Sequence, residues 1–250
     1  MKRALTVTLA LVFALISVAA GPAQADRNDG RDSNETIELA DTRMKFEINA
    51  TDDDGGIQVF LDGEQWSWIQ IYDPNGKKIF TTRTSGSMAR QGGTELFLES
   101  AEPTFDELSL EDLLDRFPEG SYRFKGRDLD GNPLVGTALL THDLPDGPEL
   151  VAPLEGDPLQ DPDDTTLEWR AVTPPIGSSI IGYQVLVVQP DTGLAALPTI
   201  TLDIMMPPTA TSLSVPPGFL QPGTEYEWEV LAIEESGNQT LSSSFFTTTG

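Results

Sequence analysis

The 250-residue sequence contains no cysteine. Without thiols the chain cannot form disulfides, bind an iron–sulfur cluster through cysteine, hold a cysteine-ligated zinc ion or use a cysteine nucleophile. Domains of roughly 100 residues can bury enough apolar surface to fold without disulfides. The folded state must therefore depend on packing and hydrogen bonds.

Basic residues are also scarce. The chain has 15 Lys and Arg residues against 40 Asp and Glu residues, which gives a formal net charge of −25. Binding to phosphates requires a basic face, so this balance excludes nucleic acid as a partner. Anionic membrane surfaces would repel the chain for the same reason. A protein or a glycan remains compatible as a partner, and solubility is the simplest role of the charge.

One long apolar run is present, and it lies at the N-terminus. The basic pair Lys2-Arg3 precedes an apolar run over residues 4–20, and Ala23-Gln24-Ala25 follows. This order is typical of a secretory signal peptide over residues 1–25, cleaved after Ala25. A membrane anchor would need roughly 20 apolar residues, more than this run has. We therefore expect a secreted or periplasmic protein with no membrane insertion after cleavage, and a flexible leader over residues 26–36.

Residues 37–147 show short alternating segments separated by turn sequences. Residues 44–48 alternate between apolar and polar, as a half-buried strand does. A helix is predicted over residues 109–117, because Ser109 can cap it and the apolar residues after it fall at helical spacing. The sequence predicts an N-terminal β-rich domain that contains this one short helix.

Residues 148–250 have a strand rhythm of their own, with turns between short segments and no helical periodicity. The Pro- and Gly-rich residues 143–148 before them are interpreted as a linker or hinge. Short strands at this spacing favour a β-sandwich. The predicted fold class is mostly β, with two β-sandwich-like domains, the first with one short helix.

The C-terminal half contains three segments that carry a family likeness: Leu167-Glu168-Trp169, Gly182-Tyr183-Gln184-Val185 and Leu220-Gln221-Pro222-Gly223-Thr224-Glu225-Tyr226. Together they resemble a fibronectin type III domain. The resemblance implies a two-sheet sandwich with Trp169 in its core, Tyr226 at a strand corner, and Tyr183 and Leu220 as further structural positions. It also implies adhesion, spacing or recognition in place of catalysis.

Two acidic turns are candidate metal sites. Asp52 and Asp54 precede a Gly-Gly pair, and Asp128 and Asp130 lie in a predicted hairpin loop. Their carboxylates could contribute oxygen ligands to calcium. The same residues are common in plain turns, and neither loop has the distal glutamate of a twelve-residue calcium loop. We therefore expect no cofactor. The alternative is a calcium ion bound at one of these two turns.

Trp66 and Trp68 are two positions apart in a predicted strand, so we expect them to share one face. Exposed rings would form a stacking platform for sugars or a protein partner. Buried rings would be core, which the intervening polar Ser67 favours. A carbohydrate-binding accessory protein that uses Trp66 and Trp68 is therefore the first functional alternative.

Signals for catalysis are weak. His142 is the single histidine, and no Gly-x-Ser-x-Gly nucleophile motif is present. No pair of the many carboxylates stands out by spacing, which leaves a hydrolase as the second alternative. The leading prediction is an exported, non-catalytic binding or structural module that acts in protein–protein or cell-surface interaction.

Overall fold

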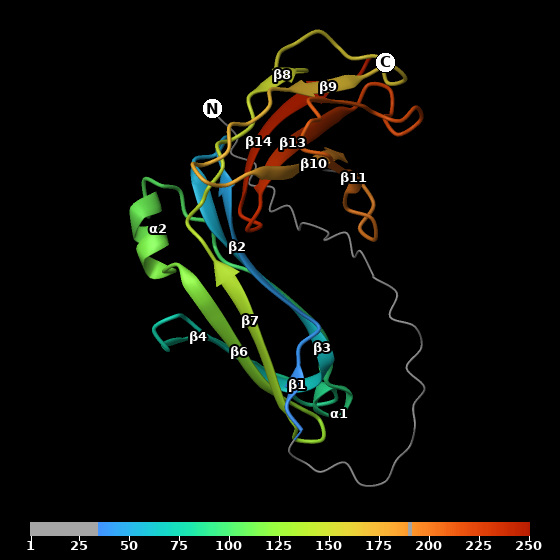
Figure 1. Ribbon diagram of the computed structural model, residues 1–250. Helices are drawn as coiled ribbons and strands as arrows, with labels where there is room; N and C mark the ends of the chain where they lie inside the picture. Colours follow the sequence, from blue (N-terminus) through green and yellow to red (C-terminus); the bar gives the residue numbers. More distant parts are fainter. Residues whose placement is uncertain (1–34, 190–191) are drawn as a thin grey trace.

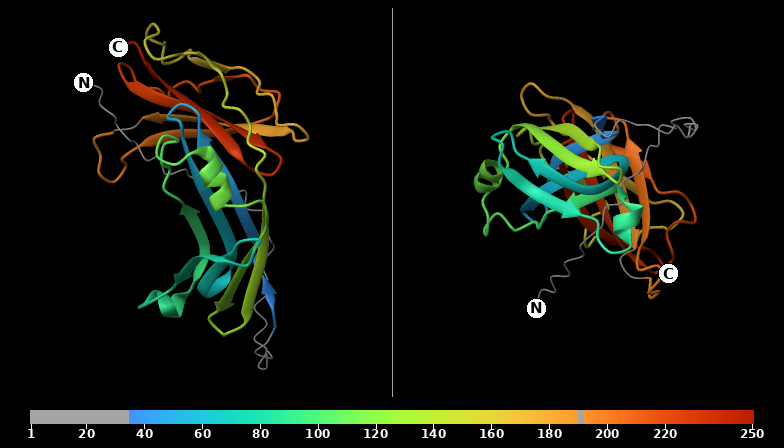
Figure 2. Two further views of the ribbon diagram at one scale, coloured as in Figure 1. Left: turned by 90° about the vertical axis from the view of Figure 1, so that its left-hand side faces the viewer. Right: turned by 90° about the horizontal axis from the view of Figure 1, so that it is seen from below.

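The computed structural model describes residues 35–189 and 192–250. The expected signal peptide and all but two residues of the expected leader lie outside these residues. Over the part described, the chain is mostly β, as predicted, with two short helices. The C-terminal half, coloured yellow to red, sits at one end of an elongated N-terminal half (Figure 1), and Figure 2 shows the same arrangement from two further directions.

The N-terminal half consists of strands around one apolar core. Its elements are β1 (Ile37–Glu38), β2 (Asp41–Asn49), β3 (Asp54–Tyr72), β4 (Lys78–Arg83), α1 (Met88–Gln91), β5 (Gly93–Glu99), α2 (Leu110–Arg116), β6 (Gly120–Asp128) and β7 (Pro133–Leu140). The first part of β3 pairs with β2 and β5, and its second part pairs with β4 and β6. Because β3 belongs to both groups, a single bent sheet encloses side chains such as Phe46, Leu61 and Phe124.

The bend in β3 has a local cause. The register with β5 shifts between Asp62 and Trp66, and Gly63 lies within that irregular segment. A Cβ atom on Gly63 would come within 2.6 Å of Leu39 Cδ2, so a larger residue there would displace the Leu39 side chain. The change of pairing partner along the strand therefore coincides with the irregular segment around Gly63.

Helix α2 forms where its capping signal predicts. The Ser109 side chain accepts a hydrogen bond from the Asp112 backbone N–H, and Leu113 is buried against the core. The sequence predicted one helix, and the structure contains a second one, α1, that was not predicted. It is a single four-residue turn in the Gly-rich loop of residues 85–93, and it buries none of its residues. A helix with no buried face has no apolar periodicity from which it could be predicted.

The C-terminal half is a two-sheet sandwich. Its strands are β8 (Leu150–Ala152), β9 (Thr166–Trp169), β10 (Ile180–Gln189), β11 (Ile200–Met206), β12 (Ser212–Ser214), β13 (Glu225–Glu234) and β14 (Gln239–Thr247). One sheet has the order β12-β9-β8, and the facing strands run β14-β13-β10-β11. An apolar core with Val185 and Trp228 lies between them. This is a fibronectin type III-like fold.

The residues that carry the family likeness lie inside this sandwich. Trp169, Tyr183, Leu220 and Tyr226 are all buried. The Tyr226 hydroxyl accepts a hydrogen bond of 2.7 Å from the Gln221 backbone N–H, which ties the start of β13 to the preceding corner. The Trp169 ring meets Tyr183 edge to face at 5.7 Å, which connects the two sheets across the core.

The two halves share one sheet. Strand β14 pairs in parallel with β2, in the register Gln239 to Glu47 and Leu241 to Asn49. The four facing strands of the C-terminal sandwich therefore continue directly into the N-terminal half as part of an eleven-stranded sheet. Parallel pairing between β14 and β2 joins strands from opposite ends of the described chain, which a pattern of local alternation cannot predict.

The segment interpreted as a linker or hinge, residues 143–148, is fixed in place. Asn238 Nδ2 donates to the Asp143 carbonyl at 3.1 Å, and Thr240 Oγ1 donates to the Pro145 carbonyl at 2.7 Å. A Cβ atom on Gly147 would lie 2.5 Å from Ala50 Cβ. The hinge interpretation is wrong, because the side chains of Asn238, just before β14, and Thr240, within β14, hold the backbone carbonyls of this segment.

Candidate functional site at the junction of the two halves

Trp66 and Trp68 do not share a face. The register of β3 with β6 shifts between these two residues, which is a β-bulge that adds one residue to β3. Trp66 consequently points into the core with Ile69 and Ile71, while Trp68 is only partly buried. The paired-ring platform is not formed, because the inserted residue reverses the alternation of the strand.

The two acidic turns also differ from a calcium loop. Asp128 accepts hydrogen bonds from the Asn132 backbone N–H and side-chain Nδ2, both at 2.7 Å, so it closes the β6–β7 hairpin, and Asp130 is exposed. In the other turn, Asp52 Oδ2 accepts from Asn49 Nδ2. Within the described residues, neither turn brings three carboxylates together.

His142 has a structural position. Its Nε2 lies 2.9 Å from the Phe117 carbonyl, and its backbone N–H donates to Glu119 Oε1 at 2.7 Å. Its ring meets Phe46 edge to face. The imidazole therefore joins the end of α2 to the core.

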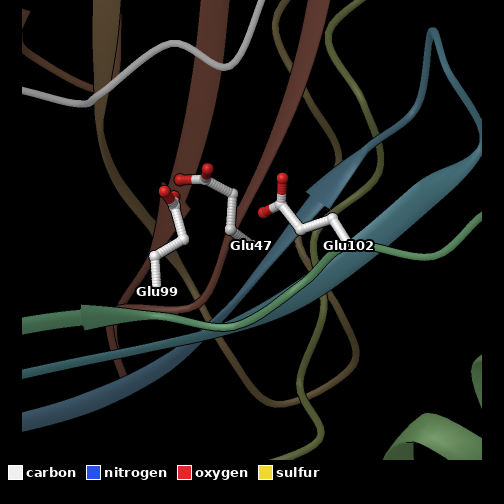
Figure 3. A group of neighbouring side chains, drawn as sticks. All are labelled: Glu47, Glu99 and Glu102. Carbon is white, nitrogen blue, oxygen red and sulfur yellow. The ribbon is translucent and has the colours of Figure 1, made fainter. Parts of the chain in front are cut away.

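Three glutamates converge beside the junction of the two halves. Glu47 comes from β2, Glu99 from the end of β5, and Glu102 from the segment that follows. One carboxylate oxygen from each lies within 4.8 Å of the others. Figure 3 shows the three carboxylates grouped above neighbouring backbone segments. We call Glu47, Glu99 and Glu102 the carboxylate cluster.

Burial and the neighbouring carboxylates raise the pKa values of Glu47 and Glu102 within this cluster. Burial, followed by the charges of Glu47, Glu99 and Asp54, raises the pKa of Glu102 to about 7. Burial is also the main cause of the raised pKa of Glu47, which Lys45 and the side-chain hydrogen bonds of Gln239 and Gln58 partly offset. Near neutral pH Glu47 and Glu102 therefore hold protons more readily than free carboxylates.

Glycine makes room for this convergence. Glu47 lies opposite Gly56 in the β2–β3 register. A Cβ atom on Gly56 would lie 2.8 Å from Glu102 Cγ and 2.7 Å from Ser100 Oγ. The absence of a side chain at Gly56 thus lets Glu102 fold back over β3 toward Glu47.

A buried polar network joins the carboxylate cluster to the C-terminal half. Gln239 Nε2 donates to Glu47 Oε2, and Lys45 Nζ donates to Gln239 Oε1 at 2.6 Å. Gln58 Nε2 donates to Glu99 Oε1 at 2.9 Å, and Gln58 is only 1% exposed. Gln58 Oε1 is buried and has no hydrogen-bond partner. The network therefore contains one acceptor whose bonding capacity is unused.

A groove runs beside the network on the same side of the shared sheet. It has a volume of about 590 Å³ and is lined by both halves, including Phe60 and Leu139 from one and Gln184 and Met205 from the other. The Arg43 guanidinium lies 4.5 Å from the centre of the Phe60 ring. We call this feature the junction groove, and it combines apolar surface with the cations of β2.

Sequence reasoning missed both features. Glu47 occupies the polar side of the alternation in residues 44–48, and that pattern predicts a solvent-facing side chain. Glu99 and Glu102 follow a strand without any recognisable spacing motif. Asp54, a predicted ligand, lies near enough to raise the pKa of Glu102, so the sequence indicated the neighbourhood but not the residues that converge.

No family model and no curated protein matches the chain. Solved structures similar to it include fibronectin(III)-like modules of Clostridium thermocellum CbhA, at 11% identity and a TM-score of 0.34 over 84% of this chain and 93% of that one. Chicken CNTN1 FN1-FN3 domains match at 13% identity and a TM-score of 0.34 over 86% and 65%. A tetra-tandem repeat from the extending region of a large adhesion protein matches at 14% identity and a TM-score of 0.28 over 83% and 49%.

The chain thus spans 93%, 65% and 49% of these three structures. At such low identities and TM-scores the likeness carries no argument about activity or partners. Among residues 35–189 and 192–250, no helix combines the length and apolar character needed to cross a membrane.

Proposed function

We propose that the chain is an exported, non-catalytic binding module, in which the C-terminal sandwich holds the N-terminal half in one orientation and presents the junction groove to a protein partner. The observation that carries the proposal is the parallel pairing of β14 with β2. A shared sheet resists bending at the junction, because bending would break main-chain hydrogen bonds between the halves. The sequence order of residues 1–25 supports export.

The side chains at the junction support the same conclusion. Asn238 is buried, accepts a hydrogen bond from the Phe46 N–H at 2.9 Å and donates to the Thr141 carbonyl at 3.0 Å. Buried polar groups that are fully hydrogen-bonded fix a unique arrangement, because any slip leaves them unsatisfied. Both walls of the junction groove are therefore held at a constant separation.

The junction groove offers the chemistry of a protein-binding surface. Leu139 and Met205 line it and are exposed at 63% and 53%. Apolar anchors beside a guanidinium favour a protein partner, since interfaces are enriched in Met and Arg. Arg43 and Lys45 line the groove, but Asp41 pairs with Arg43 at 3.0 Å and Glu235 also lines it, so the partner surface is expected to be partly apolar with charges of both signs.

Rigidity can be measured directly, because the chain has no native cysteine to compete with introduced labels. Spin labels at Asp130→Cys and Asp163→Cys would occupy exposed sites in the two halves. Pulsed electron paramagnetic resonance is expected to give one narrow distance distribution. A broad or multimodal distribution would show that the halves move independently and would refute the fixed orientation.

Binding is tested with groove and control variants. Leu139→Glu combined with Met205→Glu places charge in the junction groove, whereas Leu159→Glu combined with Ile176→Glu places it on other exposed apolar residues. In affinity capture from the extracellular fraction of the source, a specific partner should bind wild type and the control but not the groove variant. If no bound protein distinguishes the two variants, the junction groove is not the binding surface.

A further inference from the structure

We propose that Lys45 and Gln239 form an intramolecular isopeptide bond, which covalently joins β2 of the N-terminal half to β14 of the C-terminal half, with Glu47 as the proton carrier. The bond is a single reaction of the chain with itself and involves no turnover of a substrate. It links two strands that already pair in the shared sheet. The inference does not depend on a partner for the junction groove.

The reacting side chains are in contact. Lys45 Nζ lies 2.6 Å from Gln239 Oε1. Because the carbonyl bond is about 1.2 Å long, Nζ is at most about 3.8 Å from the amide carbon Cδ. Reacting atoms about 3–3.5 Å apart define a near-attack arrangement, so a small rotation of the two side chains brings Nζ into position to attack Cδ.

Strand pairing holds the three side chains together. Gln239 and Glu47 are partners in the parallel register of β14 and β2. Lys45 lies two positions before Glu47 on β2, so both side chains extend from the same face of that strand. Gln239 therefore stays beside both of them, although 194 positions separate it from Lys45. Such fixed proximity raises the effective concentration of the reacting groups.

The surroundings of Lys45 favour a nucleophilic amine. Burial lowers the pKa of Lys45 to about 8, although the charges of Glu47 and Glu99 oppose that change. Only the uncharged amine has a lone pair with which to attack a carbonyl carbon, and desolvation is one way in which proteins activate lysine. A substantial fraction of Lys45 is therefore reactive in mildly alkaline solution.

Glu47 is placed to carry the proton. Its Oε2 accepts the hydrogen bond from Gln239 Nε2, which is the nitrogen that must leave. Burial raises the pKa of Glu47, and the charge of Lys45 only partly offsets this change. The opposite changes at Lys45 and Glu47 favour an uncharged amine beside a protonated carboxyl group, which is the reactive form of the pair.

The reaction balances without another reactant. The lone pair of Lys45 Nζ forms a bond to Gln239 Cδ, Glu47 donates its proton to Nε2, and the Cδ–Nε2 bond breaks to release ammonia. The carboxylate of Glu47 then accepts the surplus proton of Nζ and returns to its starting state. The product is a secondary amide, and nothing is oxidised or reduced.

Burial also limits competition from water. Gln239 is 1% exposed and Glu47 is 4% exposed, so the amine of Lys45 has better access to Cδ than bulk water has. Gln58 is the neighbouring amide that could compete, since it pairs with Lys45 in the β2–β3 register. Gln239 is favoured because Lys45 contacts its carbonyl oxygen directly.

The test is mass spectrometry of the purified wild-type chain, incubated in its folded state at about pH 8. A linked chain is lighter by about 17 Da, the mass of ammonia. Trypsin cannot cleave after a linked Lys45, and residues 171–250 contain no Lys or Arg, so the digest should contain a branched peptide that joins residues 44–77 to residues 171–250. Fragmentation should place the link between Lys45 and Gln239. Loss of ammonia at an asparagine gives no branched peptide.

Four variants assign the roles. Lys45→Arg keeps the positive charge but lacks the nucleophilic amine, and Gln239→Leu lacks the carbonyl, so neither should give the branched peptide. Glu47→Gln removes the proton carrier and should slow formation of the link by about a hundredfold or more. Lys125→Arg, which replaces an exposed lysine on β6, is the matched control and should form the link as wild type does.

The wild-type measurement carries the test even where a variant does not fold, which circular dichroism would reveal. Absence of the branched peptide from folded wild type after prolonged incubation would overturn the proposal. A link from Lys45 to Gln58 would overturn it as well. So would a loss of about 18 Da by an amide bond between Lys45 and the Glu47 carboxyl group, because water and not ammonia would then have left.

Discussion

Gln239 of β14 donates a hydrogen bond from Nε2 to Oε2 of Glu47 on β2, although 192 positions separate the two residues in the chain. The same two residues are paired in the parallel register of their strands. The contact places a side chain of the C-terminal sandwich directly behind the carboxylate cluster of the N-terminal half. The stability of the chain and the orientation of its two halves therefore depend on the same junction.

Replacing the buried junction amide should destabilise the whole chain. Asn238→Ala would leave the Phe46 N–H and the Thr141 and Asp143 carbonyls without their partner. We expect a loss of about 2–4 kcal/mol, since each unsatisfied buried group costs about 1–3 kcal/mol and relaxation recovers part. Urea unfolding measures it, and the exposed Gln221→Ala should change stability by less than about 0.5 kcal/mol. An Asn238→Ala loss no larger than the control would show that the junction contributes little.

The tyrosine corner should contribute measurably to the C-terminal sandwich. Tyr226→Phe removes the hydroxyl that accepts from the Gln221 N–H while keeping the buried ring. The expected loss is about 1–2 kcal/mol, because the N–H loses its acceptor. Because the halves share a sheet, fluorescence and far-ultraviolet circular dichroism should report one coincident transition at a lower urea concentration. Two separated transitions would contradict the shared cooperative unit.

Stability should decrease as pH rises through the range in which Glu229 titrates. Burial, with the charges of Glu227, Glu47 and Asp52, raises the pKa of Glu229 to about 8. Between its unfolded pKa near 4.5 and about 8, the folded state holds more protons than the unfolded state, so the free energy of unfolding falls as pH rises. The slope from one proton is at most about 1.4 kcal/mol per pH unit.

Glu229→Gln removes this contribution. Denaturation curves from pH 5 to pH 9 should show a flatter pH dependence for Glu229→Gln than for wild type, and a larger gain in stability at pH 9 than at pH 5. Glu225→Gln, an exposed glutamate on the same strand, is the control. If the pH dependence of the unfolding free energy were the same in Glu229→Gln and wild type, ionisation of Glu229 would not destabilise the folded state.

The two tryptophans should behave differently because the bulge separates them. Trp66→Phe removes volume from the core and is expected to cost about 1–3 kcal/mol, whereas Trp68→Phe should cost less than about 1 kcal/mol. Acrylamide should quench the fluorescence of Trp68 more readily than that of Trp66. Comparing each single Phe variant with wild type separates the two emissions. Equal quenching and equal stability losses would contradict the assignment of opposite sides.

Local signals in the sequence predicted local structure well. Ser109 and the leucine spacing after it predict α2, because capping and apolar periodicity act within a few residues. The alternation around Tyr226 and Trp228 predicts a strand with one buried side, since successive side chains point to opposite faces. The mostly β class follows from the repetition of such segments.

Features that depend on distant residues were not predictable in the same way. The inserted residue between Trp66 and Trp68 depends on the register with β6, and alternation alone cannot reveal a bulge. The interpretation of residues 143–148 as a hinge was wrong because Asn238 and Thr240, about 95 positions away, bind its carbonyls. Proline and glycine indicate irregular backbone, but they do not show whether other strands hold it.

By itself, the sequence determined an acidic, cysteine-free chain of short strands and one capped helix, because composition and short-range periodicity act locally, and its motifs carried the resemblance of the C-terminal half to a fibronectin type III domain. Only the tertiary structure decided that β2 and β14 join the halves and that Glu47, Glu99 and Glu102 converge around Gln58. Strand pairing brings together residues that are far apart in the chain. Their burial, hydrogen bonds and charge interactions are set by that pairing, so the sequence pattern of each strand cannot predict them.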